Sequence, residues 1–536
     1  MRAAPTLRRA GLVVSGTLVA AALVATAAVG EQWTQRWTAA DEVAVAAAMR
    51  QVEVRPPTSV AVCPRPVRLP AGSDVGDDQF GAAPVESRSA VAAAVEGAAG
   101  TPLLARLDGT RARGITAGPA VDVLSEQVRG VRVLRAEPRA GAPLRVAAAL
   151  AGSTAAGDLR GLAAASCRAP ATDHWLVGGG SEVGRTALLT VQNPSVEPAA
   201  VSLEVYGPNG PVSIGGQGAF TVAPGEQEVL RLDSLAPEQR RLAVHVRATG
   251  ARVTASWQTQ GIDGLVPTGV DLLEPGDPPA RVMVASGVVG RGEAPDAPQA
   301  AALWLLAPDG RPGVARVSVY GPEGRVTLRG AEVVDLAVGA VTSVPLGGLE
   351  PGTYTVVVDA DVPVVGAARF ALPGEQPEDS VVDGTPYDVA WNAGRSLPAG
   401  PVDAGQVGLP AVAQGATVVL SAVPADRSPD VDPSGVVPVR LRGVAADGSL
   451  TGEEQVEVPV GGTVEVAADD VAAEVAVVVD PASSDDGAAP AARVVWSVRL
   501  TASDGTGTDG SLVATLDPTP SAETDGLEEV RRVDVP

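Results

Sequence analysis

Apolar and polar side chains alternate most clearly between residues 186 and 210. Val201, Leu203 and Val205 would lie on one face of a strand and the residues between them on the other, because successive strand side chains point to opposite faces. Residues 207–210 (Gly-Pro-Asn-Gly) then supply turn formers. Similar short strands recur through the chain at intervals typical of all-β domains. The pattern therefore predicts an all-β fold.

One module of this kind is duplicated. Residues 205–210 (Val-Tyr-Gly-Pro-Asn-Gly) recur as residues 319–324 (Val-Tyr-Gly-Pro-Glu-Gly), an offset of 114 residues. Residues 235–237 (Leu-Ala-Pro) match residues 349–351 (Leu-Glu-Pro) at the same offset without a gap. A weaker third copy around residues 437–448 has lost the Tyr-Gly-Pro. We predict a repeat architecture with two close copies and one diverged copy.

These signals predict tandem immunoglobulin-like β-sandwich domains that follow an N-terminal transmembrane helix. Proline-rich or acidic connectors separate the domains. The expected parts are an anchor helix and stalk (1–50), a disulfide-stapled β-rich domain (55–172), two β-sandwiches (173–275 and 280–372), a divergent β-sandwich (386–516) and an acidic disordered tail (517–536).

Composition limits the classes of partner. The 536 residues include 63 Asp and Glu against 40 Lys and Arg, a net charge of −23, and none of the basic residues is Lys. Nucleic-acid binding is driven largely by neutralisation of phosphates by basic residues, so we expect no nucleic-acid partner. The 46 Pro and 62 Gly suit a chain with many turns.

The N-terminus has the features of a targeting segment. Arg2, Arg8 and Arg9 precede an uncharged run over residues 11–29, and a membrane-spanning helix needs about 20 residues. Positive charge before the run places the bulk of the chain outside the cytoplasm. A cleaved signal peptide is the alternative, with residues 25–27 (Ala-Thr-Ala) as the cleavage site. We favour a single-pass anchor in the cell membrane.

Cys63 and Cys167 are the only cysteines. In an exported protein such a pair predicts a disulfide, and closing a loop of this length would stabilise the fold by about 4–5 kcal/mol in the chain-entropy model. Two unpaired thiols or a metal pair are the alternatives.

No catalytic, cofactor-binding or metal-binding residues are predicted. Residues 179–186 (Gly-Gly-Ser-Glu-Val-Gly-Arg-Thr) match a phosphate-binding loop with Arg in place of Lys, but a strand pattern follows where that loop needs a helix. We therefore expect a glycine-rich turn and no nucleotide. His174 and His245 are the only histidines, and each lies in a strand pattern. The tryptophans at 175, 257, 304, 391 and 496 are expected to pack in cores, although an exposed tryptophan can stack on a sugar ring.

Several short motifs together resemble exported actinobacterial proteins of the domain-of-unknown-function family 5719. The motifs are residues 175–179 (Trp-Leu-Val-Gly-Gly), 184–186 (Gly-Arg-Thr), 193–194 (Asn-Pro), 205–210, 253–255 (Val-Thr-Ala), 263–265 (Asp-Gly-Leu) and 269–271 (Gly-Val-Asp). The resemblance spans about residues 63–370. It implies an extracytoplasmic, membrane-associated protein of β domains, encoded near glycosyltransferases, and it implies no reaction.

The sequence therefore predicts a membrane-anchored structural or binding protein of the cell envelope rather than an enzyme. We expect a scaffold or partner in envelope glycan assembly, with an envelope protein or a glycan as the ligand. A carbohydrate-binding module or a subunit of a glycan-active enzyme is the alternative. A hydrolase would need two carboxylates that converge in a cleft.

Overall fold

The structure is a computed structural model. It describes residues 49–53, 58–70, 87–139, 144–328, 330–376, 383–428, 433–482, 491–505, 510–520 and 527–531. The chain divides into two units, Met1–Pro56 with Thr524–Pro536, and Pro57–Glu523. Among the described residues, no helix is both long and apolar enough to cross a membrane. Of the predicted anchor helix and stalk (1–50), residues 1–48 lie outside this part of the chain.

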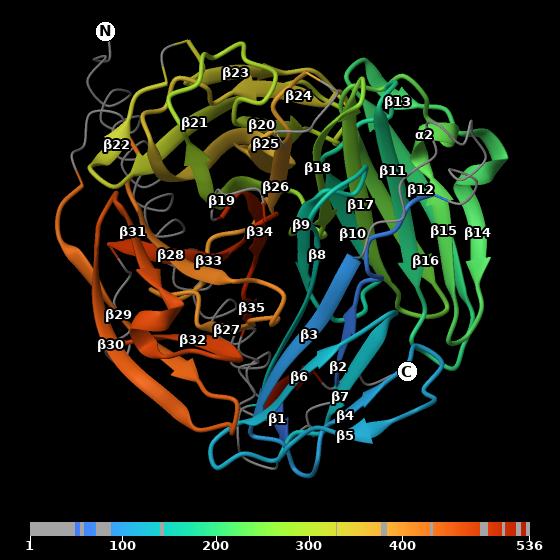
Figure 1. Cartoon of the computed structure of the whole chain (residues 1–536), viewed down its shortest axis with the longest axis vertical. Coiled ribbons are helices and arrows are strands. Elements are labelled where there is room, and N and C mark those ends of the chain that lie inside the picture. The colour runs from blue at the N-terminus through green and yellow to red at the C-terminus, as the bar shows by residue number, and fades with distance from the viewer. Residues whose placement is uncertain are drawn as a thin grey trace, which may run out of the picture. The chain divides into compact units, whose positions relative to one another are not determined.

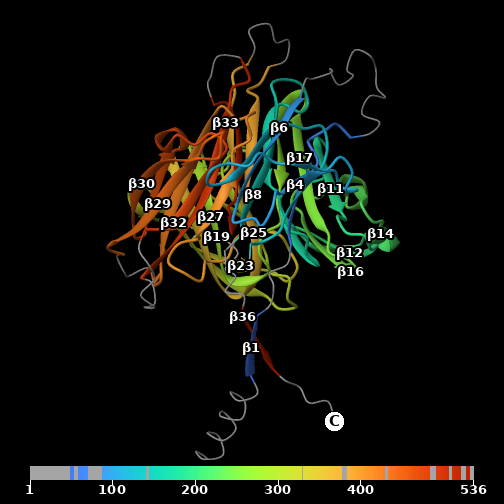
Figure 2. The same cartoon turned by 90° about the horizontal axis from the view of Figure 1, so that it is seen from below.

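The first unit contains one strand from near each end of the chain. β1 (Met49–Glu53) pairs antiparallel with β36 (Leu527–Arg531), as Figure 2 shows. The prediction of a helical stalk as far as residue 50 is therefore wrong at its last two residues, which are extended. The prediction of a disordered tail from residue 517 is also wrong in part, because β35 (Thr519–Pro520) and β36 both pair with other strands.

The second unit consists of four modules, each built of two sheets, arranged around a common centre (Figure 1). The first module comprises β2 (Ser59–Cys63), β3 (Ser87–Glu96), β4 (Leu103–Ala105), β5 (Arg113–Gly114), β6 (Asp122–Gln127), β7 (Arg132–Ala136), β8 (Arg145–Thr154) and β9 (Gly161–Ser166). The second comprises β10 (Asp173–Val177), β11 (Arg185–Gln192), β12 (Ala199–Gly207), β13 (Gly210–Val212), β14 (Ala219–Val222), β15 (Gln227–Arg231), β16 (Ala243–Thr249), β17 (Thr254–Asp263) and β18 (Val266–Leu273).

The other two modules follow in the same way. The third comprises β19 (Ala280–Gly290), β20 (Ala302–Leu306), β21 (Gly313–Gly321), β22 (Gly324–Val326), β23 (Val333–Leu336), β24 (Thr342–Pro345), β25 (Gly352–Pro373) and β26 (Tyr387–Ala393). The fourth comprises β27 (Gly405–Gly408), β28 (Gly415–Pro424), β29 (Val436–Val444), β30 (Leu450–Pro459), β31 (Thr463–Ala467), β32 (Ala476–Pro481), β33 (Ala492–Ala502) and β34 (Leu512–Leu516). The helical turns η1 (Gly215–Gly218), α2 (Leu232–Leu235) and η2 (Ala468–Val471) are short connections.

All four modules share one strand order. Apart from the added strands β14, β23 and β35, one sheet of each module has the order first, sixth, third, fourth, as in β2-β7-β4-β5 and β27-β32-β29-β30. The other sheet has the order fifth, second, seventh, eighth, as in β6-β3-β8-β9 and β31-β28-β33-β34. In the third module the long strand β25 serves as both sixth and seventh strand. The immunoglobulin order, in which the first strand pairs with the second, is therefore not the order found.

The duplication is confirmed down to the pairing of individual residues. β12, β13 and β14 correspond to β21, β22 and β23 at an offset of 114 residues throughout. Tyr206 pairs with Pro211 in the second module as Tyr320 pairs with Arg325 in the third. The two Tyr-Gly-Pro segments therefore form the same hairpin in the same sheet.

One predicted boundary is wrong. Residues 386–393 were assigned to the fourth domain, but β26 pairs with the second half of β25 and completes the third module. The acidic connector before it, which includes residues 374–376 and 383–385, therefore lies within a module instead of between two. The eighth strand of a module can be joined by a long loop, so loop composition alone does not mark the boundary.

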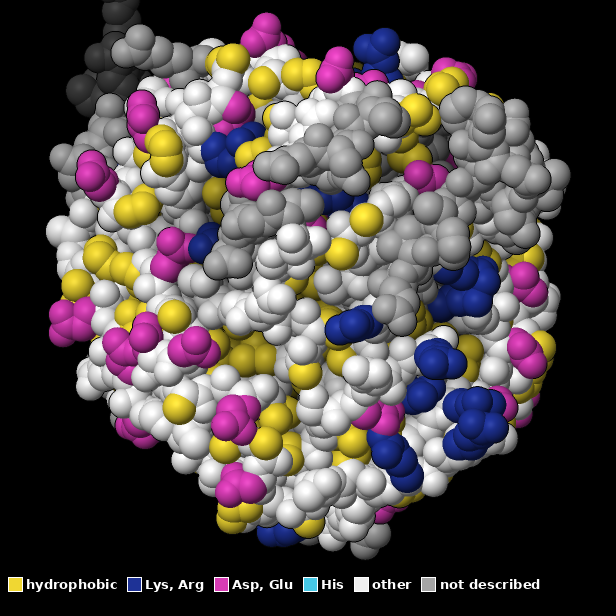
Figure 3. All heavy atoms as spheres, in the orientation of Figure 1, with side chains coloured by type: hydrophobic (Ala, Val, Ile, Leu, Met, Phe, Trp, Pro, Cys, Tyr) yellow, Lys and Arg dark blue, Asp and Glu magenta, His cyan; other side chains and the backbone are white. Residues whose placement is uncertain are grey.

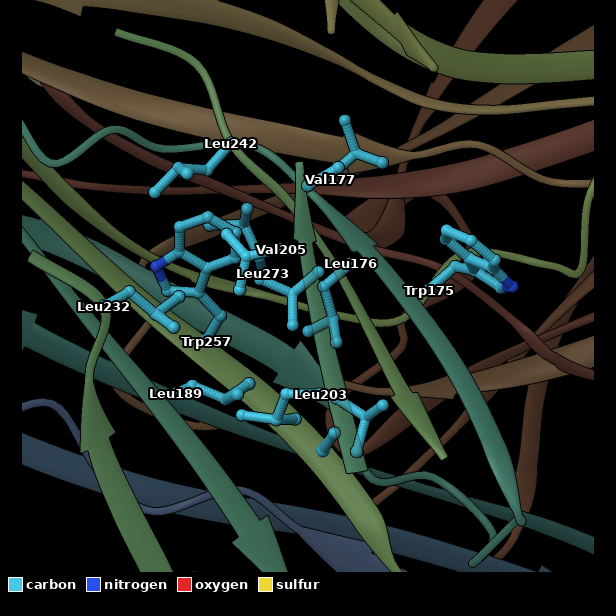
Figure 4. Close-up of a cluster of buried hydrophobic side chains, with 14 of the residues drawn as sticks. Trp175, Leu176, Val177, Leu189, Leu203, Val205, Leu232, Leu242, Trp257 and Leu273 are labelled. Carbon is cyan, nitrogen blue, oxygen red and sulfur yellow. The ribbon is translucent and has the colours of Figure 1, made fainter. Parts of the chain in front are cut away.

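Each core fills the space between the two sheets of its module. In the second module, Leu176, Leu203 and Val205 from one sheet meet Leu189 and Trp257 from the other (Figure 4). The other three cores are formed in the same way, mainly by Val, Leu and Ala. Short aliphatic side chains are enough to fill each core, because the core is only the space between two packed sheets.

The modules contact one another through two repeated interfaces. The eighth strands β9, β18, β26 and β34 lie at the centre of the second unit, and each contacts the next. In addition, the hairpin of the third and fourth strands contacts the segment before the fifth strand of the next module. Val341 N donates to Gly207 O at 2.9 Å, Thr463 Oγ1 to Tyr320 O at 2.9 Å and Val121 N to Gly448 O at 3.0 Å. The last contact joins the fourth module to the first and closes the arrangement.

The predicted disulfide is present. Cys63 ends β2 and Cys167 follows β9, and their sulfur atoms are 2.03 Å apart. Both residues are buried in the core of the first module. The bond therefore joins the first strand of one sheet to the end of the last strand of the other.

We expect the Cys63→Ala/Cys167→Ala variant to lose about 4–5 kcal/mol of unfolding free energy, because the open chain regains loop entropy in the unfolded state. Denaturant unfolding measures the loss, and reduced wild-type protein should match the variant. Oxidised protein should migrate faster than reduced protein on electrophoresis. Equal stability of the oxidised protein and the variant would contradict the expectation.

Candidate functional site

The described part of the second unit has two prominent polar features, a buried column of charges at its centre and an arginine-rich cleft at its edge. In the central column, Asp388 of β26 is fully buried. Its Oδ2 accepts hydrogen bonds from Leu162 N at 2.8 Å and Val513 N at 2.7 Å, and its Oδ1 from Val270 N at 3.4 Å and Val389 N at 3.0 Å. One carboxylate thus accepts an N–H from a strand of every module.

The position of this carboxylate follows from the sheet edges. β9, β18, β26 and β34 are the edge strands of their sheets, so some of their N–H groups have no partner in a sheet. A buried N–H without an acceptor is costly, and Asp388 supplies the acceptor. Asp271 of β18 does the same nearby, accepting from Leu272 N at 2.8 Å, Trp391 N at 2.8 Å and Ala164 N at 3.4 Å. Both carboxylates hold the modules together.

A ring of alternating charges follows the central strands. Arg168, Glu274, Arg395 and Asp517 each lie one or two residues beyond the eighth strand of their module. Arg168 Nε donates to Glu274 Oε2 at 2.6 Å, and Arg168 Nη2 lies 3.6 Å from Asp517 Oδ2. Burial alone would lower the pKa of Arg395, but the surrounding carboxylates, Asp517 first, outweigh burial and raise it. The alternation of signs places every charge of the ring beside an opposite one.

Burial shifts the central carboxyl groups towards their neutral form. It raises the pKa of Asp388 to about 7, against the opposing effect of the N–H donors and of Arg160. It also raises the pKa of Asp271 well above its usual value, and the nearby charge of Asp388 adds to this effect. Burial raises the pKa of Asp403 to about 6. The raised pKa values of Asp271 and Asp388 are caused by burial. Because main-chain N–H groups already occupy both side chains, we assign these residues a role in packing.

The arginine cleft lies where the first module meets the second. It has a volume of about 360 Å³ and is lined by residues 106–108 and 129–132 of the first module and 225–227 of the second. It is the counterpart, between these two modules, of the repeated hairpin interface. The approach is so close here that a Cβ atom on Gly225 (φ +70°) would lie 2.9 Å from Asp108 Cα. The loop between β4 and β5 is longer than the two-residue turns of the next two modules, and the cleft lies beside it.

The cationic groups of the cleft are Arg106, Arg129 and Arg132. Arg106 and Arg129 are exposed, whereas Arg132 is half-buried and pairs with Glu126, its Nε 3.2 Å from Oε1. Burial lowers the pKa of Arg132, and the positive charge of Arg111 adds to that effect. Figure 3 shows arginine side chains gathered in the lower right of the view, the side on which Figure 1 places β4, β5 and β7. The first module thus presents a cationic surface on an acidic protein.

The two carboxylates that line the cleft, Asp108 and Glu226, would compete only in part with an anionic ligand for these arginines. Asp108 Oδ1 accepts hydrogen bonds from Thr110 N at 2.9 Å and Thr110 Oγ1 at 2.7 Å, and these bonds lower the pKa of Asp108. Glu226 is exposed at the opposite wall. The sequence carried a signal that our prediction missed: residues 58–172 contain more Arg than Asp and Glu together, although the whole chain has a net charge of −23.

The sequence motifs fall into ordinary structural places. The glycine-rich segment at 179–184 is a loop between β10 and β11, and Arg185 opens a strand. His174 Nε2 bonds to Val253 O at 2.8 Å, and burial lowers the pKa of His174. His245 stacks on Trp175 with ring centroids 3.8 Å apart and bonds to Asp173. The five tryptophans assigned to cores are all buried, at 175, 257, 304, 391 and 496. Among the described residues, no group of three or more His, Cys, Asp and Glu is placed to hold a metal ion.

The fold and the two polar features define an all-β protein of four repeated two-sheet modules. Comparison with protein families places the chain in one of them: residues 122–469 match the model of the family of unknown function DUF5719, and the chain belongs to this family. The match covers the second and third modules whole and the first and fourth modules in part. No curated protein sequence matches the chain.

Solved structures with some similarity have low scores. A Thermotoga maritima protein, 1070, has 14% identity and a TM-score of 0.16, over 22% of this chain and 93% of its own. The BSP domain of a biofilm-associated protein has 9% identity and a TM-score of 0.13, over 89% and 96%. An α-L-rhamnosidase of Streptomyces avermitilis has 11% identity and a TM-score of 0.10, over 81% and 56%. These likenesses carry no argument about function.

We expect Asp388→Asn to lower the unfolding free energy by about 2–4 kcal/mol, because an amide NH₂ would face main-chain N–H donors that need an acceptor. Denaturant unfolding measures the loss. Asp383→Asn, the same change at an exposed position shortly before it in sequence, is the control and should leave the stability unchanged. Equal stability of both variants would contradict the role of Asp388.

The stability that Asp388 contributes should also rise as the pH falls from about 7.5 to 5, whereas buried His174, whose pKa is lowered, acts in the opposite direction. A carboxyl whose pKa is higher in the folded protein than in the unfolded chain binds its proton more tightly when folded, so its contribution is greatest at low pH and is lost as the pH rises through the folded value. From a pKa of about 7, Asp388 alone contributes about 2–3 kcal/mol across this window. Denaturant unfolding of the wild type and of Asp388→Asn at several pH values tests this, and a difference in unfolding free energy that grows towards pH 7.5 would contradict it.

Proposed function

We propose that this protein is a membrane-anchored binding protein of the cell envelope, and that its arginine cleft binds an acidic glycan. The observation that carries the proposal is that Arg106, Arg129 and Arg132 line one open cleft of about 360 Å³, in which Arg106 and Arg129 are exposed. Guanidinium groups bind carboxylate and phosphate groups through paired hydrogen bonds. A cleft of this size holds a sugar residue with its charged substituent.

The position of the cleft supports a binding role. At three of the four junctions between modules, a main-chain N–H or a hydroxyl of the next module donates a hydrogen bond to a carbonyl group of the hairpin. At the junction of the first and second modules the hairpin loop instead runs beside a basic cleft. A repeated interface modified at one position offers a ligand site without loss of the shared architecture.

Net charge does not prevent such binding. The Debye length at physiological ionic strength is about 8 Å, so most acidic side chains of the other modules are screened from a ligand in the cleft. The arginines near the cleft therefore contribute more to the binding of an anion than the net charge of the whole chain does. The same screening predicts that binding weakens as salt is added.

The anchor and the compartment belong to the same proposal. The uncharged run at residues 11–29 after three arginines would hold the protein in the membrane, and the modules would extend outside the cytoplasm. The disulfide supports this compartment, since disulfides persist in oxidising environments. Function as a scaffold, without catalysis of its own, is consistent with the packing role of the central carboxylates.

We expect Arg106→Glu/Arg129→Glu to weaken binding to immobilised polygalacturonate at least tenfold, because two cations that face the ligand become anions. Biolayer interferometry measures the affinity, with neutral dextran as the reference surface. The matched control is Arg252→Glu/Arg281→Glu, which makes the same change of net charge at exposed positions in the second and third modules. Equal weakening in both variants, or equal binding of wild-type protein to dextran, would contradict the proposal.

A further inference from the structure

A second polar pocket lies between the second and third modules, away from the arginine cleft. Its volume is about 60 Å³. β11, β17 and β18 contribute Arg185, Gln260 and Thr268, and β20, β25 and β26 contribute Trp304, Arg369 and Trp391. The glycine-rich loop with its Glu182, and the exposed Arg240, also line the pocket. Residues of both close copies of the repeat therefore form this pocket.

Two of the three arginines that line the pocket, Arg185 and Arg369, are half-buried. Arg185 Nη1 donates to Thr268 Oγ1 at 2.7 Å, and Arg369 Nη2 donates to Pro298 O at 2.9 Å. Glu182 is the carboxylate of the pocket, and its Oε1 is 3.8 Å from Arg185 Nε. Burial first, and then the positive charge of Arg185, together lower the pKa of Arg369 to about 10. The like charges would be relieved by an anion between them.

Several buried polar atoms in the pocket have no hydrogen-bond partner among the residues that the structure describes. One is a donor, Arg369 Nε, and two are acceptors, Gln260 Oε1 and Glu182 Oε2. Gln260 is 4% exposed, and its Nε2 is occupied by Asp158 O at 2.9 Å. A buried acceptor without a donor is costly, so a ligand hydroxyl would satisfy it.

The backbone leaves room for these groups. A Cβ atom on Gly261 would lie 1.9 Å from Arg185 Nη1 and 2.3 Å from Thr268 Oγ1. Only a glycine at this position lets the guanidinium lie across β17 and reach Thr268. The pocket is thus shaped by the absence of a side chain as well as by the charged groups.

We propose that this pocket binds a small oxyanion that carries its own hydroxyl group. The guanidinium groups of Arg185 and Arg369 would bind the oxygen atoms that share the negative charge, and Gln260 Oε1 and Glu182 Oε2 would accept from the hydroxyl. Inorganic phosphate and the end of an α-hydroxy acid both have this chemistry, and both match a volume of about 60 Å³.

The tryptophans strengthen such a site. Trp304 and Trp391 pack edge to face with ring centroids 4.8 Å apart, and both are buried. Their rings exclude water from one wall, and charged hydrogen bonds are stronger where water is excluded. The sequence resemblance of residues 179–186 to a phosphate loop has no part in this inference, because the loop contributes Gly179, Gly180 and Glu182 without a helix behind them.

Isothermal titration calorimetry on the full chain tests the site with inorganic phosphate and with sulfate at equal ionic strength. Sulfate has no hydroxyl at neutral pH, so phosphate should bind at least tenfold more tightly. Glycolate against acetate forms the second pair. Tighter binding of phosphate than of glycolate identifies free phosphate as the source of the ligand, and the reverse identifies a hydroxy acid; either result supports the site.

Gln260→Glu, which has nearly the same shape, should weaken phosphate binding at least tenfold, because it adds a negative charge where the hydroxyl is accepted. Gln217→Glu, at an exposed position of the second module, is the matched control and should bind as wild type does. If circular dichroism shows that Gln260→Glu does not fold, Arg369→Lys takes its place, since lysine keeps the charge but loses the Nε donor. Absence of binding, equal binding of phosphate and sulfate, or unchanged binding by the variant would overturn the proposal. None of these results depends on the arginine cleft.

Discussion

The structure depends on how the unpaired N–H groups at the edges of four sheets find hydrogen-bond acceptors where the sheets meet. Each module ends in an edge strand, and the four edge strands pack together without forming a continuous sheet. Their free N–H groups converge on Asp388, with Asp271 beside it. A carboxylate is suited to this place because it accepts several hydrogen bonds at once and donates none when ionised. Burial opposes its charge, and the N–H donors offset part of that cost.

Much of the strand content could be predicted from alternation alone, because one face of each outer strand is exposed. The strand around Val201–Val205 and the hairpin after it are examples. The second copy at Tyr320 could be predicted because its sequence is nearly the same. The eighth strands were missed for the opposite reason. β9, β18 and β34 are buried on both faces along most of their length, since they lie at the centre, so their sequences do not alternate between apolar and polar residues.

The fourfold repeat was recognised only in part. The first module has alanine-rich strands, and its hairpin contains the loop at residues 106–112 where the second and third modules have a Gly-Pro turn. The four modules share a strand order even where their sequences are not similar. The packing of two sheets constrains which strands pair, but it accepts many different small apolar residues. The arginine cleft could not be located either: its walls come from segments about 100 residues apart that only the junction of two modules brings together.

Repetition also explains where ligand sites can form in this fold. The four central strands and the charge ring are needed by every module, so a change there would affect the whole unit. The junctions between neighbouring modules are less constrained, since each is one of four similar contacts. Both sites argued above lie at such junctions, one between the first and second modules and one between the second and third. Arginine is the cation at both, as it must be in a chain without lysine, and its planar fork would make each proposed site selective for oxyanions rather than for negative charge alone.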